Sequence, residues 1–289
     1  MIDTGLRDKV VLITGANNPH GIGAATTKAF AAQGAKVFLH YFRANQPSGE
    51  AREAPGEAFY YHQQSKNADE VLNVVRDLGA QAEAEEADLS DPAVIPVLFD
   101  QAEKRLGPVE VLVNNAAAWE GDTFVLPTAS LRNELVELWT KRPSTIDAGI
   151  FDRLFAVNTR AVALMMAEFT RRHVARGANW GSIVNISTAG AEAFPSEISY
   201  GASKLALEGY TRSAALELGQ FGITVNVLSL GPVQTGWITP ELEKEILPTI
   251  PLGRIGRPED VAGVIVFFAS EQARWVTAQK IYVGGGHGM

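Results

Sequence analysis

Two residues suited to proton transfer, Tyr200 and Lys204, stand four positions apart at the start of a predicted helix over 200–219. That spacing places both side chains on one helical face. A neighbouring ammonium stabilises a tyrosinate and lowers the tyrosine pKa from its usual value of about 10. A tyrosine tuned in this way can give or take a proton near neutral pH. Tyr-x-x-x-Lys alone, however, is more often only a surface pair.

The position of Ser187 adds weight to that pair. Ser187 lies thirteen residues before Tyr200 and directly follows an apolar predicted strand over 182–186. In open α/β sheets, ligands bind at the carboxyl ends of the strands. The three residues are therefore candidates for one site, with a simple loop cap as the alternative for Ser187.

A glycine-rich turn follows the first predicted strand, Lys9 to Thr14. Gly15, Gly21 and Gly23 flank this turn just before a predicted helix over 23–33. Glycines let the backbone approach a pyrophosphate, and the helix N-terminus offers free N–H groups and a positive dipole end. The turn predicts a dinucleotide site, with a tight ligand-free turn as the alternative.

The end of the second predicted strand bears on the choice of dinucleotide. A fold that prefers NAD usually places Asp or Glu there to accept from the ribose 2′-hydroxyl. This strand ends in His40-Tyr41-Phe42-Arg43 instead, and Arg43 is able to pair with a 2′-phosphate. We therefore expect NADP(H) to be favoured over NAD(H), unless Arg43 is only a solvated loop charge. Asp88 fits either an adenine contact or an N-cap.

Short β-branched runs alternate with helical patterns along the chain. This alternation implies βαβ crossovers and a parallel sheet covered by helices on both faces. One α/β domain over 1–289 accounts for the pattern, with loop insertions near 42–67 and 119–150. Long loops in compact domains are usually functional or mobile. The predicted strands cover 9–14, 35–41, 80–87, 109–113, 182–186, 224–228 and 280–283, and the predicted helices cover 23–33, 68–78, 93–106, 151–176, 200–219 and 258–269.

Composition excludes several classes of function. The chain has 25 Lys+Arg against 33 Asp+Glu, a net charge of -8, which argues against a nucleic-acid or anionic-membrane partner. It has no cysteine, so disulfides, thiolate metal sites and a cysteine nucleophile are excluded. The five histidines show no ligand spacing, so we expect no metal. No signal peptide or membrane span is apparent, and a cytoplasmic location is the default expectation.

With these pieces together, the chain resembles the short-chain dehydrogenase/reductase family from Lys9 to about Gly286. Within the family it is most similar to 3-oxoacyl-[acyl-carrier-protein] reductases, through Tyr41, Arg43 and the Asp88-Leu89 pair. The resemblance implies a single-domain Rossmann-type doubly wound sheet and a homotetramer. The matching pieces are Thr14-Gly15…Gly21-Ile22-Gly23, Asn114-Asn115-Ala116-Ala117, Asn158, Ser187, Tyr200-xxx-Lys204, 231–235, Arg257-Pro258-Glu259-Asp260 and Val283-Gly284-Gly285-Gly286.

The resemblance also implies roles for individual residues. Tyr200 would be the general acid in carbonyl reduction and the base in alcohol oxidation. Lys204 would lower its pKa and bond the nicotinamide ribose, Ser187 would polarise the substrate carbonyl, and Asn158 would hold a water that relays protons. The implied cofactor contacts are Gly15, Asn17, Gly21, Ile22, Gly23, Tyr41, Arg43, Asp88, Leu89, Asn115, Ala116, Tyr200, Lys204, Gly231, Val233 and Thr235.

Three departures from the family pattern stand out. Five residues separate Gly15 from Gly21 where three are common, so the phosphate loop must bulge. The usual Pro-Gly before the substrate loop appears as Leu230-Gly231, and Gly284 replaces an acid before the last glycines. None of these removes the proposed catalytic set.

The function expected from this is an NADPH-dependent oxidoreductase that acts on a small-molecule ketone or secondary alcohol, with 3-oxoacyl thioesters among the candidates. A non-catalytic NADP-binding redox sensor and a non-redox enzyme on the same fold are the alternatives. Sensors of that kind generally lose the tyrosine or lysine. The expected pocket wall includes Ala189, Phe194, Trp237 and parts of 119–150, among them Trp119 and Trp139.

Overall fold

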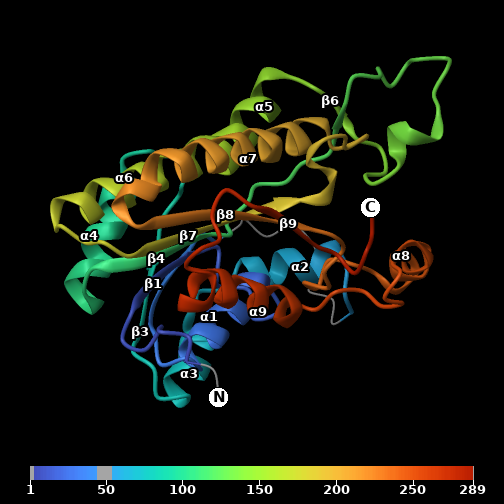
Figure 1. Ribbon diagram of the computed structural model, residues 1–289. Helices are drawn as coiled ribbons and strands as arrows, with labels where there is room; N and C mark the ends of the chain where they lie inside the picture. The colour runs from blue at the N-terminus through green and yellow to red at the C-terminus, as the bar shows by residue number, and fades with distance from the viewer. Residues whose placement is uncertain (1–2, 44–53, 289) are drawn as a thin grey trace.

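The core of the protein is a seven-stranded sheet in which all neighbouring strands run parallel (Figure 1). The computed structural model describes residues 3–43 and 54–288. The strand order is β3-β2-β1-β4-β7-β8-β9. The order reverses between β1 and β4, where doubly wound folds bind their ligands. The strands are β1 (Val10–Thr14), β2 (Lys36–Tyr41), β3 (Ala82–Glu86), β4 (Val109–Asn114), β7 (Gly181–Thr188), β8 (Ile223–Leu230) and β9 (Lys280–Val283).

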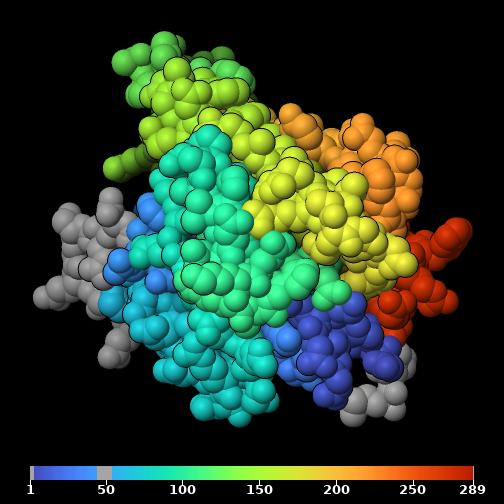
Figure 2. All heavy atoms as spheres, turned by 90° about the vertical axis from the view of Figure 1, so that its left-hand side faces the viewer, coloured from blue at the N-terminus to red at the C-terminus, as the bar shows by residue number. Residues whose placement is uncertain are grey.

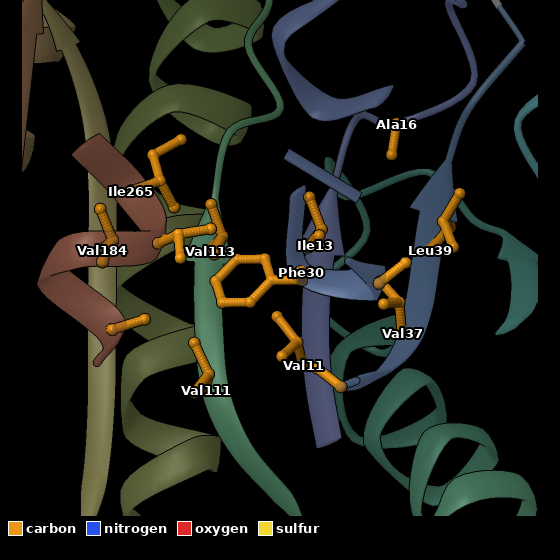
Figure 3. Packing of buried hydrophobic residues seen from close by; sticks show 14 of the residues in the cluster. Val11, Ile13, Ala16, Phe30, Val37, Leu39, Val111, Val113, Val184 and Ile265 are labelled. Atoms are coloured by element: carbon orange, nitrogen blue, oxygen red, sulfur yellow. The ribbon is translucent and has the colours of Figure 1, made fainter. Parts of the chain in front are cut away.

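Helices cover both faces of the sheet, as predicted, because its central strands are apolar on both sides. Figure 3 shows the Phe30 ring packed among Val11 and Val111 on the first face. Figure 2 shows two helices of the second face, α4 and α6, side by side. The first face carries α1 (Ile22–Ala31), α3 (Asp69–Asp77) and α9 (Pro258–Ala269), and the second carries α4 (Val94–Leu106), α6 (Val162–Ala175) and α7 (Ile198–Leu218).

Several boundaries differ from the sequence prediction. The helix predicted over 151–176 is divided into α5 (Ala148–Phe155), a π-helical segment (Ala156–Ala161) and α6. The 42–67 insertion has little periodicity yet contains a helix, α2 (Glu57–Gln64); its residues 44–53 lie outside the described part. The 119–150 insertion contains a small two-stranded sheet, β5 (Asp122–Thr123) with β6 (Ser144–Thr145), and a 3₁₀ turn (Glu134–Glu137). A short helix, α8 (Pro240–Ile246), precedes α9.

Two further features concern possible partners of the protein. Among residues 3–43 and 54–288, none of the helices has the length and apolar character needed to cross a membrane. Nor does this part of the chain gather three or more His, Asp or Glu side chains in a way that would hold a metal ion.

Candidate active site

Helix α7 brings Tyr200 and Lys204 to the carboxyl end of β7, one turn apart on the same face. Lys204 is 1% exposed, and its Nζ donates to the Ile186 carbonyl at 2.9 Å. The same Nζ lies 5.9 Å from the centroid of the Tyr200 ring. The ring of Phe194 borders Tyr200 from the other side, 6.0 Å between centroids. The spacing of four therefore places a buried lysine beside a partly buried tyrosine, and the two do not form an exposed surface pair.

Burial controls the charges of this pair. It lowers the pKa of Lys204 to about 8 because a buried ammonium loses its hydration. It raises the pKa of Tyr200, and the nearby acids Glu197 and Tyr60 add to that shift. The direction is opposite to the expectation that Lys204 lowers the tyrosine pKa, because desolvation of the phenolate is the largest cause and it raises the pKa. At neutral pH, Tyr200 holds its proton and Lys204 is mostly charged.

Asn158 lies in the π-helical segment between α5 and α6. Its Nδ2 donates to Ala118 O at 2.9 Å and to Ser203 Oγ at 3.0 Å, and its Oδ1 accepts from Ala118 N at 2.8 Å. Ser203 directly precedes Lys204 in α7. The Asn158 amide therefore joins the chain after β4 to the helix that carries the tyrosine and lysine, and one Oδ1 lone pair remains for a water.

Ser187 is engaged elsewhere. Its Oγ donates to Glu208 Oε1 at 2.7 Å, and Lys280 Nζ lies 2.9 Å from Glu208 Oε2. Ser187 and Glu208 are 3% and 2% exposed. Glu208 follows Tyr200 by eight residues on α7, which is about 12 Å along the helix axis. The Ser187 proton is thus directed to a carboxylate whose residue follows Tyr200 by about two turns of α7.

Sequence reasoning overlooked Glu208 and Lys280. The signal for Glu208 was its position four residues after Lys204, on the same face of the same helix. The next residue of β7, Thr188, accepts from Gly190 N through its Oγ1 at 3.3 Å. Thr188 therefore presents a second hydroxyl at the end of β7.

The phosphate loop has the close approaches that require glycine. Gly15 has φ +70°, and a Cβ there would lie 2.8 Å from Ala116 Cα. A Cβ on Gly23 would lie 2.3 Å from Gly15 O. Asn115 Nδ2 holds the turn from the neighbouring strand, with donations to the carbonyls of Thr14 and Gly15 at 2.9 Å each. With α1 starting at Ile22, these residues fit the pyrophosphate of a dinucleotide.

The two extra loop residues have a structural consequence. Asn17 is 1% exposed, and its Nδ2 donates to the carbonyls of Gln64 at 2.9 Å and Lys66 at 2.8 Å. Asn18 Nδ2 donates to Thr235 O at 3.3 Å. The bulged loop therefore connects the α2 insertion to the segment after β8. The Asn17 side chain is occupied by this connection, which leaves its main chain for the predicted cofactor contact.

At the adenosine end of the predicted site, Tyr41 pairs in register with Glu86 of β3. Arg43 Nε bonds both Glu86 oxygens, at 2.9 and 3.0 Å. Asp88 Oδ1 accepts from Ser90 N at 2.8 Å, so Asp88 closes a turn and does not cap α4, whose N-cap is Ala93. Leu89 is 6% exposed and packs in the core of the second face.

The remaining predicted contacts lie after β4 and β8. Ala116 N donates to Thr14 Oγ1 at 3.0 Å, which ties it to the phosphate loop. A Cβ on Gly231 would lie 2.7 Å from Gly284 Cα, and Val233 forms a bridge with Gly256. These contacts hold the segment 231–235 beside the C-terminal glycines, at the carboxyl ends of β8 and β9.

Aromatic side chains from both insertions meet near Tyr200. The rings of Trp119 and Trp237 are 4.7 Å apart, and the Tyr60 ring of α2 meets Trp237 edge-on at 5.5 Å. Trp139 packs against Phe194 at 5.8 Å. Gly56 N donates to Gly236 O at 2.8 Å, which fixes the start of α2 against the same loop. The structure brings these predicted aromatic residues into contact with one another, and α2 is an addition that low periodicity concealed.

Two buried acids beneath this wall were also overlooked. Asp122 is fully buried, and its Oδ1 accepts from Ser199 N at 2.9 Å at the start of α7. Glu197 accepts from Thr140 Oγ1 at 3.0 Å and from the Trp119 indole, and burial raises its pKa. The 119–150 insertion is thereby fastened to the end of the helix that carries Tyr200.

Known proteins resemble this chain over almost its whole length. The family profile described as Enoyl-(Acyl carrier protein) reductase matches residues 53–287. The chain is 32% identical to the Uncharacterized oxidoreductase YjdA of Bacillus subtilis, over 97% of this chain and 97% of that protein. It is 30% identical to the Versicolorin reductase stcU of Emericella nidulans, over 97% of this chain and 96% of that protein.

Solved structures agree with these sequence matches. A short-chain dehydrogenase/reductase from Serratia marcescens matches with a TM-score of 0.78 and 27% identity, over 98% of this chain and 99% of that chain. A blue fluorescent protein from a metagenomic library, solved in complex with NADPH, matches with a TM-score of 0.77 and 29% identity, over 98% and 99%. Fold, motifs and relatives together show that the chain is an oxidoreductase of the short-chain dehydrogenase/reductase family.

Proposed function

We propose that the protein reduces a ketone to a secondary alcohol with NADPH and that Tyr200 donates the proton. The observation that carries this proposal is the Tyr200–Lys204 pair: the buried Lys204 bonds the Ile186 carbonyl near the carboxyl end of β7, and its Nζ lies 5.9 Å from the centroid of the Tyr200 ring. A redox sensor would have no need for a buried tyrosine and lysine at this point.

The protonation states of Tyr200 and Lys204 favour ketone reduction over alcohol oxidation. Burial raises the pKa of Tyr200, so the phenol is protonated at neutral pH and ready to serve as an acid. NADPH, when bound, would supply the hydride. Lys204, whose pKa is lowered to about 8, is charged below that pH and stabilises the tyrosinate left by proton transfer. Alcohol oxidation would first require Tyr200 to lose its proton, which burial opposes.

The substrate carbonyl also needs a hydrogen-bond donor, and β7 ends in two hydroxyls. Ser187 is the residue predicted for this role, but its proton goes to Glu208 at 2.7 Å. The Thr188 hydroxyl accepts from Gly190 N, which leaves its own proton for a substrate. We propose that a hydroxyl at this strand end polarises the carbonyl, and the bond to Glu208 favours Thr188. We propose that Asn158 positions a water that returns a proton toward Lys204.

The proposed cofactor contacts follow the elements described above. The cradle around Gly15 and Gly23 supports the pyrophosphate site, and the relative solved with NADPH supports that cofactor. Tyr41 and Arg43, with no acid at the end of β2, support NADPH over NADH. The residues proposed to hold the cofactor are Gly15, Asn17, Gly21, Ile22, Gly23, Tyr41, Arg43, Asp88, Leu89, Asn115, Ala116, Tyr200, Lys204, Gly231, Val233 and Thr235.

The aromatic wall guides the choice of substrate. Trp119, Trp237 and Tyr60 present ring edges and faces near Tyr200, which suit a flat apolar body. The relative named versicolorin reductase supports the same choice. We therefore propose a carbonyl compound with a flat apolar ring system, with 3-oxoacyl thioesters as the second class to compare.

A spectrophotometric screen tests the function. Loss of NADPH absorbance is followed against aromatic ketones, aliphatic ketones and β-ketoacyl thioesters, with enzyme-free and Tyr200→Phe reactions as controls. We expect turnover with aromatic ketones first, falling as the pH rises through about 8 because Lys204 then loses its charge. Tight NADPH binding without turnover of any carbonyl would overturn the reductase in favour of a sensor.

Assembly and location are proposals as well. We propose a homotetramer in the cytoplasm. Phe267 of α9 is 46% exposed and Leu164 of α6 is 38% exposed, which is apolar surface on two helices that a partner copy would cover. Light scattering that reported a single-chain mass at micromolar concentration would contradict the tetramer.

A further inference from the structure

The guanidinium of Arg43 already has a partner at the adenosine end of the cofactor site. Its Nε bonds both oxygens of Glu86, and its Nη2 lies 2.8 Å from Glu86 Oε2. The backbone N–H of Arg43 also donates to Glu86 Oε1 at 3.3 Å. Glu86 is the last residue of β3 and lies in register with Tyr41 at the end of β2. The acid therefore stands on the neighbouring strand, where the sequence shows none on β2.

The surroundings of Tyr41 are acidic. The charged side chains that act on its phenol are the carboxylates of Glu86, Asp69 and Glu85, and the guanidinium of Arg43. A 2′-phosphate placed here would gain from Arg43 but would be repelled by the carboxylates. At this site the attraction between a 2′-phosphate and Arg43 is therefore opposed by the bond between Arg43 and Glu86.

We infer that Glu86 competes with the 2′-phosphate of NADPH for Arg43 and thereby sets how strongly the protein prefers NADPH to NADH. This inference rests on the proposed function. The side chains of Arg43 and Glu86 are 56% and 30% exposed, and exposed ion pairs are weak enough for an incoming phosphate to displace. NADH carries no 2′-phosphate and leaves the pair intact.

Glu85 provides a matched control one residue away. It carries the same charge on the same strand, but its carboxylate pairs with Arg105 at 2.8 Å. Glu86→Gln and Glu85→Gln therefore make the same change in net charge, and only Glu86→Gln releases Arg43. Unfolding midpoints of both variants should match the parent protein, since both pairs are partly exposed.

The test is fluorescence titration of NADPH and NADH at low ionic strength, where surface charges are least screened. We expect Glu86→Gln to shift the ratio of the two dissociation constants about fivefold toward NADPH. We expect Glu85→Gln to shift it by less than about twofold, through general electrostatics alone. In an Arg43→Ala background, Glu86→Gln should keep only the small part of its effect that comes from direct repulsion of the 2′-phosphate, because no guanidinium remains to be released.

The results separate this inference from the proposed function. Equal shifts in the two glutamate variants would overturn the inference, as would a full shift in the Arg43→Ala background. If the parent protein binds neither cofactor, the proposed function fails and this inference with it. If both cofactors bind and only the ratio fails to move, the function stands and the role of Glu86 is wrong.

Discussion

Two polar groups of very different character meet on α7, where Lys204 of one and Glu208 of the other are one turn apart. The upper pair, Tyr200 and Lys204, has few partners: the Lys204 ammonium gives one of its three N–H groups to Ile186 O. The lower cluster, Ser187, Glu208 and Lys280, is fully paired, with each Glu208 oxygen bonded at 2.7 or 2.9 Å. Lys204, Ser187 and Glu208 are 1%, 3% and 2% exposed, so the burial of these residues alone does not distinguish the proposed catalytic group from the structural one.

The pKa values of Lys204 and Lys280 are shifted in opposite directions. Burial lowers the pKa of Lys204 to about 8, since no carboxylate compensates it. The pKa of Lys280 is raised: desolvation opposes the shift, but Glu208, Tyr282 and Glu192 together outweigh it. Buried groups whose pKa is shifted against their charged form are candidates for functional sites, which supports the role proposed for Lys204. The lower cluster has the pattern of a group that stabilises the fold.

The largest expected effect is on turnover when Tyr200 is changed. Tyr200→Phe removes one hydroxyl and keeps the ring against Phe194. We expect turnover to fall about 10²–10⁴-fold, the usual contribution of a general acid. The dissociation constant for NADPH and the unfolding midpoint should stay nearly unchanged. Tyr210→Phe on the same helix, at a tyrosine that is 51% exposed, is the matched control. A Tyr200→Phe variant with a tenth of the parent rate would remove Tyr200 from its proposed role.

The second expected effect is on stability and depends on pH. The pKa of Lys204 in the folded protein is about 8, below its value of about 10.5 in the unfolded chain. Below pH 8 both states bind the proton, and the folded state bears the whole cost of the buried ammonium. Between these pH values the unfolded state binds more protons, so stability rises with pH. Lys204→Met should therefore stabilise the protein by about 2–3 kcal/mol near neutral pH, and the gain should shrink as pH approaches 10.

Urea unfolding of the parent and variant across this pH range measures the effect, and Lys280→Met supplies the contrast. Lys280→Met should destabilise the protein by about 1–2 kcal/mol at neutral pH, because Glu208 then lacks its cation. Lys204→Met should also weaken cofactor binding and turnover. If Lys204→Met and Lys280→Met changed the free energy of unfolding in the same direction, the proposed difference between Lys204 and Lys280 would be wrong.

The third effect concerns the lower cluster alone. Glu208→Gln keeps the size of the side chain and an acceptor for Ser187, but leaves Lys280 without its buried carboxylate. We expect a loss of about 2 kcal/mol in the free energy of unfolding, with turnover of the folded variant within about threefold of the parent. Urea titration and initial rates on the same sample measure both. A variant of normal stability with a large loss in turnover would make Glu208 part of the catalytic machinery.

Much of the fold was predictable because its signals are local. Strands such as β1 are apolar, β-branched runs in the sequence, and the glycine turn after β1 predicted the close backbone approaches found there. Helix α2 was missed because its stability comes from other elements: Asn17 fixes its C-terminal end and Trp237 packs on Tyr60. Such tertiary contacts produce no hydrophobic periodicity in the sequence of the helix.

The site was predictable to the extent that one element carries it. Tyr200 and Lys204 lie on a single helix, so their spacing determines their proximity. Glu86 and Arg43 come from neighbouring strands, and only the register of β2 with β3 brings them together. Ser187 was chosen by its distance along the chain from Tyr200, which does not say to which group its hydroxyl points. The structure shows that group to be Glu208.

The smallest effect decides between the two hydroxyls at the end of β7. Ser187→Ala removes a donor to Glu208 that is already engaged, whereas Thr188→Val removes a hydroxyl that only accepts from Gly190 N. We expect turnover to fall about tenfold in Thr188→Val, the value of one hydrogen bond to the carbonyl, and less than about threefold in Ser187→Ala. Ser187→Ala should instead lower the free energy of unfolding by about 1 kcal/mol, because Glu208 Oε1 is left unpaired in the interior. Initial rates, NADPH titration and urea unfolding on both variants give the answer. If the loss of turnover appeared in Ser187→Ala with its stability intact, the Ser187 hydroxyl would leave Glu208 during the reaction, and the lower cluster would join the active site.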